Sequence, residues 1–96
     1  MNPQAGREQA GHRPAYVVSP KAYNGKVGMA LMCPITSKEK GYAFEVRLDG
    51  NTTKGVVLSD QVKSLDWRAR GTRFEERADD PVIADVAAKI DVLIKI

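Results

Sequence analysis

The feature that most constrains the fold of these 96 residues is a change in the spacing of apolar residues, from strand-like segments to one final segment with helical spacing. Seven apolar side chains in the segment 79–96 recur at helical spacing, which places them on one face of an α-helix. They are Val82, Ile83, Val86, Ala87, Ile90, Leu93 and Ile94. Asp79 or Asp80 can cap this helix, and Pro81 suits its first turn. We therefore expect one amphipathic helix at the end of the chain.

The segments before this helix read as short strands separated by turns. We expect strands over residues 16–19, 27–33, 42–48, 55–62 and 72–77. Asn24-Gly25 is typical of a hairpin turn, and 49–51 forms another turn. One face of the alternating strand 42–48 consists of Tyr42, Phe44, Val46 and Leu48. Several short strands followed by one helix predict a small, strongly bent barrel, mainly β, closed by the C-terminal helix.

Length and composition favour a single small globular domain over residues 1–96. The chain is 43% hydrophobic and 28% charged, which is ordinary for a folded domain. No apolar run approaches the roughly 20 residues that span a bilayer, and nothing resembles a signal peptide. Cys33 is the only cysteine, so no internal disulfide can form. We expect a cytoplasmic protein in which Cys33 is a buried small hydrophobe rather than a nucleophile.

Positive charge gathers in the first half of the chain. The net charge is +3, with seven Lys and Arg against three Asp and Glu in residues 1–48 and eight against nine in residues 49–96. A positive first half can attract phosphate, which fits a nucleic-acid partner. Charge alone would favour an ordinary solvated surface.

The segment 4–20 joins a polar, glycine-bracketed loop to an apolar strand. The loop carries Glu8, Gln9, His12 and Arg13 between Gly6 and the strand. Loops hold reactive groups while strands fix their position, so this junction is a natural site.

This segment closely resembles the signature of the MazF/PemK family of toxin endoribonucleases. Three further pieces match in the same order, at residues 33–37, 40–46 and 55–70. Four motifs in register are strong evidence, and the resemblance covers nearly the whole chain. It implies an SH3-like barrel of the CcdB/PemK type. Family members usually begin with a strand ahead of the loop that starts here at Asn2-Pro3, so about one strand of the barrel is expected to be absent.

Metal-free RNA cleavage uses the 2′-hydroxyl of the substrate as its nucleophile. It needs a base, cations or donors on the phosphoryl oxygens, and a donor to the departing 5′-oxygen. Arg13 has a planar, permanently charged fork that matches phosphate, and Thr36 offers a hydroxyl. By resemblance these two match the catalytic Arg and Thr of the family. Glu8 is the carboxylate best placed to act as the base, with weaker support from the family.

Other polar residues of the motifs are candidates for RNA binding. They are Gln9, His12, Ser37, Lys40, Glu45 and Gln61. Ser37, Lys40 and Gln61 could equally be solvated surface residues, and for Glu45 the two interpretations are about level. A general-base role for His12 is disfavoured, because the adjacent Arg13 opposes a second positive charge. Trp67 could stack a base, but a core or subunit-interface position is preferred.

We expect neither a metal nor another cofactor, because one His and one Cys, widely separated, match no familiar ligand spacing. The resemblance implies a homodimeric toxin that cleaves single-stranded messenger RNA to 2′,3′-cyclic phosphate and 5′-hydroxyl ends. It also implies an antitoxin of the MazE type, whose flexible acidic tail covers the RNA groove. Two alternatives stay open. One is a toxin of the same fold without catalysis, such as a gyrase poison, and the other is a truncated relative that only binds antitoxin.

Overall fold

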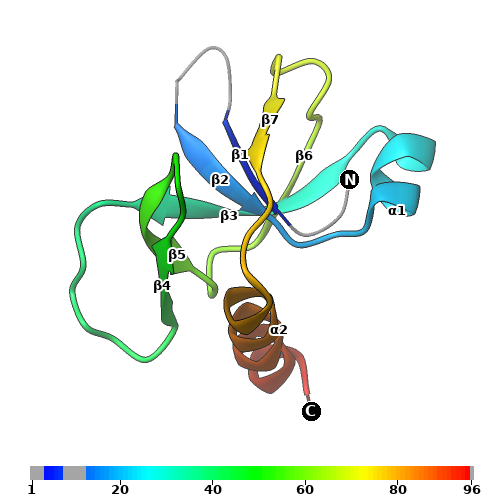
Figure 1. Cartoon of the computed structure of the whole chain (residues 1–96). Helices are drawn as coiled ribbons and strands as arrows, with labels where there is room; N and C mark the ends of the chain where they lie inside the picture. Colours follow the sequence, from blue (N-terminus) through cyan, green and yellow to red (C-terminus); the bar gives the residue numbers. More distant parts are fainter. Residues whose placement is uncertain (1–3, 8–12, 96) are drawn as a thin grey trace.

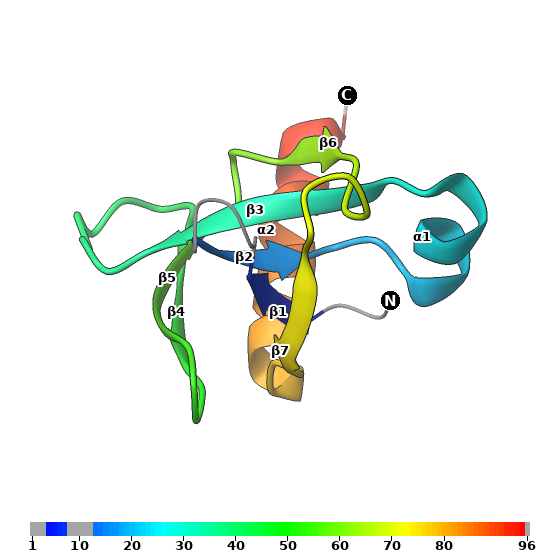
Figure 2. The same cartoon turned by 90° about the horizontal axis from the view of Figure 1, so that it is seen from above.

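The computed structural model describes residues 4–7 and 13–95, which form a curved sheet with a long helix beside it (Figures 1 and 2). The strands are β1 (Gln4–Arg7), β2 (Pro14–Val17), β3 (Ala30–Thr36), β4 (Glu45–Asp49), β5 (Lys54–Leu58), β6 (Lys63–Leu65) and β7 (Arg73–Glu76). The helices are α1 (Lys21–Val27) and α2 (Asp80–Ile94). The mainly β fold with a C-terminal helix is therefore confirmed.

The sheet is built around β3, its longest strand. Its order is β4-β5-β3-β2-β1-β7, and β6 also pairs with β3. The first part of β3, Ala30–Met32, pairs with β6, and its last residues, Ile35 and Thr36, pair with β5. Pro34 stands at this change of partner, and proline, which has no amide N–H, suits an interruption in a ladder. The change of partner divides the sheet into two parts, with the end of β3 at their junction.

Two apolar clusters lie on the sheet. The larger one holds Tyr16, Cys33, Ile35, Val46, Leu48, Val57, Ala78 and Val86, with Val82, Ile83 and Ile90 packed against it. Of the seven apolar residues predicted for the buried face of α2, Val82, Ile83, Val86 and Ile90 cover this cluster, whereas Ala87, Leu93 and Ile94 are exposed. The helix lies below the sheet in Figure 1. The smaller cluster joins Val17, Ala30 and Met32 to Leu65 and Trp67. Both clusters fix β2 and β3, the strands that end at the candidate site.

Helix α2 agrees closely with its sequence pattern. It begins at Asp80 with Asp79 as its N-cap residue, although the Asp79 side chain makes no capping hydrogen bond. The exposed side of the helix carries ion pairs between residues four apart, at 2.8 Å for Lys89–Asp85 and 3.0 Å for Lys95–Asp91.

The predicted hairpin turn at Asn24-Gly25 is wrong, because these residues lie within helix α1. Asn24 is fully buried, and its Nδ2 donates to the Ser19 carbonyl oxygen at 3.1 Å. The indole Nε1 of Trp67 donates to the Asn24 carbonyl oxygen, also at 3.1 Å. Gly28, in the left-handed conformation at φ 80°, ends the helix instead. The hydrogen bonds of Asn24 with Ser19 and Trp67 therefore outweigh the local preference of Asn-Gly for a turn.

Two further expectations need correction. The loop predicted over residues 2–11 contains strand β1, which pairs with β2 and β7. Its residues, Gln-Ala-Gly-Arg, show no apolar alternation, so no local pattern indicated a strand here. Strand β4 begins at Glu45 rather than at Tyr42. Tyr42 therefore does not share the buried strand face of Val46 and Leu48, and its side chain is exposed.

A carboxylate at the end of β7 ties that strand to the β4–β5 turn. Glu76 accepts hydrogen bonds from the backbone N–H groups of Asn51 at 2.9 Å, Thr52 at 2.7 Å and Thr53 at 2.7 Å. These bonds favour the charged form, so they lower the pKa of Glu76 below its ordinary value of 4.5. Its folded pKa thus lies below its unfolded pKa. The stabilisation is present above the unfolded pKa and is lost as pH falls through the folded pKa.

We expect Glu76→Gln to lower the free energy of unfolding near neutral pH by about 1 kcal/mol, because a neutral amide cannot accept all three bonds. The deficit should shrink as the pH falls through the acidic range, where wild-type Glu76 becomes protonated. Urea unfolding of both proteins at neutral and acidic pH measures this, with Asp91→Asn as a control that removes an exposed helical ion pair. An equal difference at every pH would contradict the assignment.

Candidate active site

A cavity of about 600 Å³ lies where the ends of β2, β3 and β5 meet the loop before β4. Five residues predicted as site residues line it, although they come from four separate parts of the sequence. They are Arg13, Thr36, Lys40, Glu45 and Gln61. We call this the active-site cavity.

Arg13 and Thr36 reach the cavity from adjacent strands. Arg13 is exposed and directly precedes β2, while Thr36 is the last residue of β3, which pairs with β2. The Thr36 Oγ1 accepts a hydrogen bond from the Lys38 amide at 3.2 Å. Because a hydroxyl both donates and accepts, the Thr36 proton can still be given to a phosphoryl oxygen. The pair thus combines a planar cation with a fixed hydroxyl donor.

Glycine at position 55 allows β5 to approach Thr36. Gly55 has φ 145°, a conformation that L residues rarely adopt. A Cβ at this position would lie 2.4 Å from the Thr36 carbonyl oxygen and 3.0 Å from its carbonyl carbon. The backbone of Thr36 is therefore placed by direct contact with Gly55.

Lys38 and Lys40 bring further positive charge to the same cavity from the β3–β4 loop, residues 37–44. The carboxylate of Glu45, at the start of β4, is directed to that loop. It accepts the backbone N–H of Lys40 at 3.0 Å and that of Gly41 at 2.8 Å. The structure therefore gives Glu45 specific protein partners that the sequence did not reveal.

The remaining predicted residues are not all brought together. Ser37 lines a different cavity of about 220 Å³, beside Arg47 and Lys54, so the structure does not place it with Arg13 and Thr36. Glu8, Gln9 and His12 lie outside the described residues.

Two polar residues that line the cavity were not predicted from the sequence. Lys38 lines it, and its charge beside Thr36 was the available signal. Tyr42 also lines it, and its hydroxyl donates to the Asp60 carboxylate at 2.8 Å. This hydrogen bond raises the pKa of Tyr42 above its ordinary value of 10.0. The Tyr42–Asp60 contact joins residues 18 apart, so no local pattern could have indicated it.

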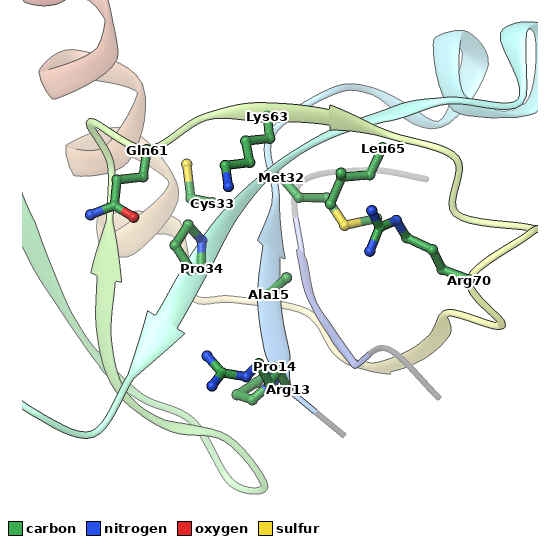
Figure 3. Close-up of a pocket in the computed structure, with 10 residues that line it drawn as sticks. All are labelled: Arg13, Pro14, Ala15, Met32, Cys33, Pro34, Gln61, Lys63, Leu65 and Arg70. Carbon is green, nitrogen blue, oxygen red and sulfur yellow. The ribbon is translucent and has the colours of Figure 1, made fainter. Parts of the chain in front are cut away.

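A second cavity of about 260 Å³ adjoins the active-site cavity and shares Arg13, Pro34 and Gln61 with it. In Figure 3 the guanidinium groups of Arg13 and Arg70 lie on separate sides of this second cavity, with Ala15 between them and Met32 beside Arg70. Lys63 lines it from β6. Cationic side chains therefore extend beyond Arg13 into the second cavity, which apolar side chains also line.

Cys33 is fully buried, as predicted. Burial, with a smaller contribution from the Asp60 carboxylate, raises the pKa of the Cys33 thiol to about 12. A thiol with that pKa is protonated near neutral pH, so Cys33 is not an active nucleophile. Trp67 is partly buried against the smaller apolar cluster and carries Arg68 over its ring at 4.8 Å, so the structure places it at the edge of the core.

Within residues 4–7 and 13–95, the structure shows no group of three or more His, Cys, Asp or Glu side chains that could hold a metal ion. No helix among these residues is long and apolar enough to span a membrane.

Comparison with known proteins agrees with the motifs. Residues 1–94 match the family described as PemK-like, MazF-like toxins of type II toxin–antitoxin systems. The endoribonuclease toxin MazF of Escherichia coli (strain K12) is 52% identical over 94 residues, which are 98% of this chain and 85% of that protein. Endoribonuclease PemK of Escherichia coli is 31% identical over 99 residues, covering 98% of this chain and 74% of that protein.

Solved structures show the same fold. A MazE–MazF crystal structure from Deinococcus radiodurans contains a chain with a TM-score of 0.90 and 43% identity, covering 95% of this chain and 90% of that chain. The Mycobacterium tuberculosis toxin MazF-mt6, at 20% identity, has a TM-score of 0.76 over 95% of this chain and 94% of that chain, a likeness of fold alone. The chain therefore belongs to the family of PemK-like, MazF-like toxins of type II toxin–antitoxin systems.

Proposed function

We propose that this chain is a toxin endoribonuclease that cleaves single-stranded messenger RNA in the active-site cavity without a metal ion. The observation that carries the proposal is the meeting of Arg13 and Thr36 in one cavity, with Lys38 and Lys40 beside them. Relatives with 52% and 31% identity are named endoribonucleases, which supports the same activity here. A gyrase poison of the same fold would not need a phosphate-matched cation beside a hydroxyl donor.

In this mechanism the 2′-oxygen of the substrate attacks the adjacent phosphorus and the bond from phosphorus to the 5′-oxygen breaks. The 2′-hydroxyl proton passes to a base, for which Glu8 is the candidate, and the departing 5′-oxygen takes up a proton from solvent water. Arg13 binds two phosphoryl oxygens through its planar fork, and Thr36 donates to one of them. The products are a 2′,3′-cyclic phosphate and a 5′-hydroxyl.

The cationic groups of both cavities also fit the proposed partners. An acidic antitoxin tail and RNA are both polyanions, so each is attracted to Arg13, Lys40 and Lys63. The relatives from Deinococcus radiodurans were solved as MazE–MazF complexes, which supports a MazE-like antitoxin for this chain. We infer a homodimer, since Phe74, Val92 and Ile94 expose apolar side chains. We also propose a cytoplasmic location, which action on messenger RNA would require.

Cleavage of a mixed-sequence RNA in EDTA, followed by mapping of both ends, tests this function. We expect cuts at a defined short sequence, with cyclic phosphate and 5′-hydroxyl ends, because Arg13 and Thr36 take the place of a metal at the phosphate. His12→Ala should retain far more activity than Arg13→Ala.

Activity that chelation abolishes and a divalent ion restores would reject the metal-free mechanism. Antitoxin binding with no cleavage under any condition would instead favour the truncated, inactive relative. Inhibition of gyrase without RNA cleavage would favour the gyrase poison.

A further inference from the structure

Glu45 presents an electrostatic problem in the proposed site. It lines a cavity whose cations, Arg13, Lys38 and Lys40, suit an RNA phosphate, yet it carries a negative charge. A carboxylate that faces a polyanion weakens RNA binding unless it also makes interactions that favour RNA binding. The contacts of Glu45 indicate what that is.

Both oxygens of the Glu45 carboxylate bind the β3–β4 loop rather than pointing freely into the cavity. Oε2 accepts the Lys40 N–H at 3.0 Å, and Oε1 accepts the Gly41 N–H at 2.8 Å. The backbone N–H of Glu45 donates to the Tyr42 carbonyl oxygen at 3.2 Å. Gly41 has φ 83°, which glycine adopts without strain, so the loop turns sharply around the carboxylate. One residue of a fixed strand thus holds three consecutive loop residues.

The same loop is also held by two contacts that do not involve Glu45. The Tyr42 hydroxyl donates to Asp60 at 2.8 Å, and Arg47 of β4 pairs with Glu39 at 2.8 Å. Glu45 differs from these tethers because it binds the backbone at Lys40 itself. Removing the Glu45 carboxylate therefore releases the backbone of Lys40, the cationic loop residue that this carboxylate holds.

We propose that Glu45 is a positioning residue that holds the β3–β4 loop so that Lys40 meets an RNA phosphate. This inference rests on the proposed function, because it assigns a role within the same RNA-binding cavity. It replaces the interpretation of Glu45 as a direct RNA contact. The negative charge of Glu45 alone would weaken RNA binding, whereas its positioning of the loop strengthens RNA binding.

Binding is measured with a single-stranded oligonucleotide that spans a mapped cleavage site and carries a 2′-deoxy nucleotide at the cut, so that it stays intact. Each phosphate contact on single-stranded nucleic acid contributes a slope of about −0.7 to the dependence of log K on log salt. Lys40→Ala should therefore make the slope shallower by about 0.7. Glu45→Ala should weaken binding several-fold and make the slope shallower by a similar amount. In the double variant the slope should change no further.

Two companion variants keep the test independent of charge and of folding. Gly41→Ala leaves every charge in place but strains the loop at φ 83°, and it should weaken binding in the same direction. Glu45→Gln retains one acceptor oxygen and should fall between wild type and Glu45→Ala. Asp85→Asn, on α2, controls for the loss of one negative charge at a residue that lines neither the active-site cavity nor the second cavity.

Tighter RNA binding by Glu45→Ala would show an ordinary surface carboxylate and would overturn the proposal. Weaker binding with an unchanged salt slope would show a direct contact with RNA, which also overturns it. Because the probe cannot be cut, these outcomes concern positioning alone. A wild-type protein that neither binds nor cleaves any RNA would instead show that the proposed function is wrong.

Discussion

Replacing Arg13 or Thr36 by alanine should each lower the rate of RNA cleavage by about 10²–10³-fold while the protein stays folded. In the proposed mechanism, each side chain is a preorganised donor to charge that develops on the phosphoryl oxygens. Arg13 is exposed and Thr36 stands at a strand end, so neither truncation opens a large cavity in the core. Arg13→Lys should also be impaired, since an ammonium group cannot reproduce the planar fork. Single-turnover cleavage of a mapped RNA site measures these effects.

The chain offers matched controls for both variants. Arg73→Ala removes the same charge from an exposed arginine in β7 that pairs with Glu75 at 3.4 Å, outside both site cavities. Thr52→Ala removes a threonine side chain from the exposed β4–β5 turn. Both controls should cleave at rates close to wild type. Near-normal turnover by either Arg13→Ala or Thr36→Ala would remove that residue from the catalytic assignment.

Gly55→Ala should be strongly destabilising although it adds a single methyl group. The added Cβ meets the Thr36 carbonyl oxygen at 2.4 Å, and φ 145° is itself strained for alanine. Backbone strain and overpacking together predict a loss of about 2–6 kcal/mol in the free energy of unfolding. This is a large part of the total of about 5–15 kcal/mol expected for a domain of this kind. Any relaxation of the clash must move Thr36, so cleavage should fall as well.

Gly25→Ala is the control for this change. Gly25 lies in helix α1, and a Cβ there would meet nothing within 4 Å. Alanine in a helix is favoured over glycine by up to about 1 kcal/mol, so this variant should be neutral or slightly more stable. Thermal unfolding and cleavage rates of the two variants give the comparison. A Gly55→Ala protein with the melting temperature and turnover of wild type would show that β5 does not position Thr36.

A helix or strand could be predicted from the sequence where the contacts that determine it join residues close together in the sequence. Helix α2 was predicted well because its apolar spacing and ion pairs lie within one segment. Helix α1 was missed because Asn24 gains its partners from Ser19 and Trp67, and only the first of these is nearby in sequence. Strand β1 was missed because backbone pairing with β2 and β7, rather than an apolar pattern, defines it.

The site shows the same division. Arg13 and Thr36 were predicted because residue chemistry and motif pointed to them, and the pairing of β2 with β3 brings both to one cavity. The role of Glu45 depends on which hydrogen bonds its carboxylate makes, and residue type does not decide that. Ser37 was included because it follows Thr36 in the motif. Adjacent residues near a strand end point to different sides, and Ser37 lines another cavity.

The central claim is that Arg13 and Thr36 promote attack by the 2′-hydroxyl of the substrate on the adjacent phosphate. It is tested most directly with two oligonucleotides that contain a mapped cleavage site and differ only in a 2′-deoxy nucleotide at the position before the cut. We predict that both bind with similar affinity in EDTA, that the ribonucleotide form is cleaved, and that the deoxy form stays intact. Cleavage of the deoxy form at the same bond would contradict the account, because the proposed nucleophile would then be absent.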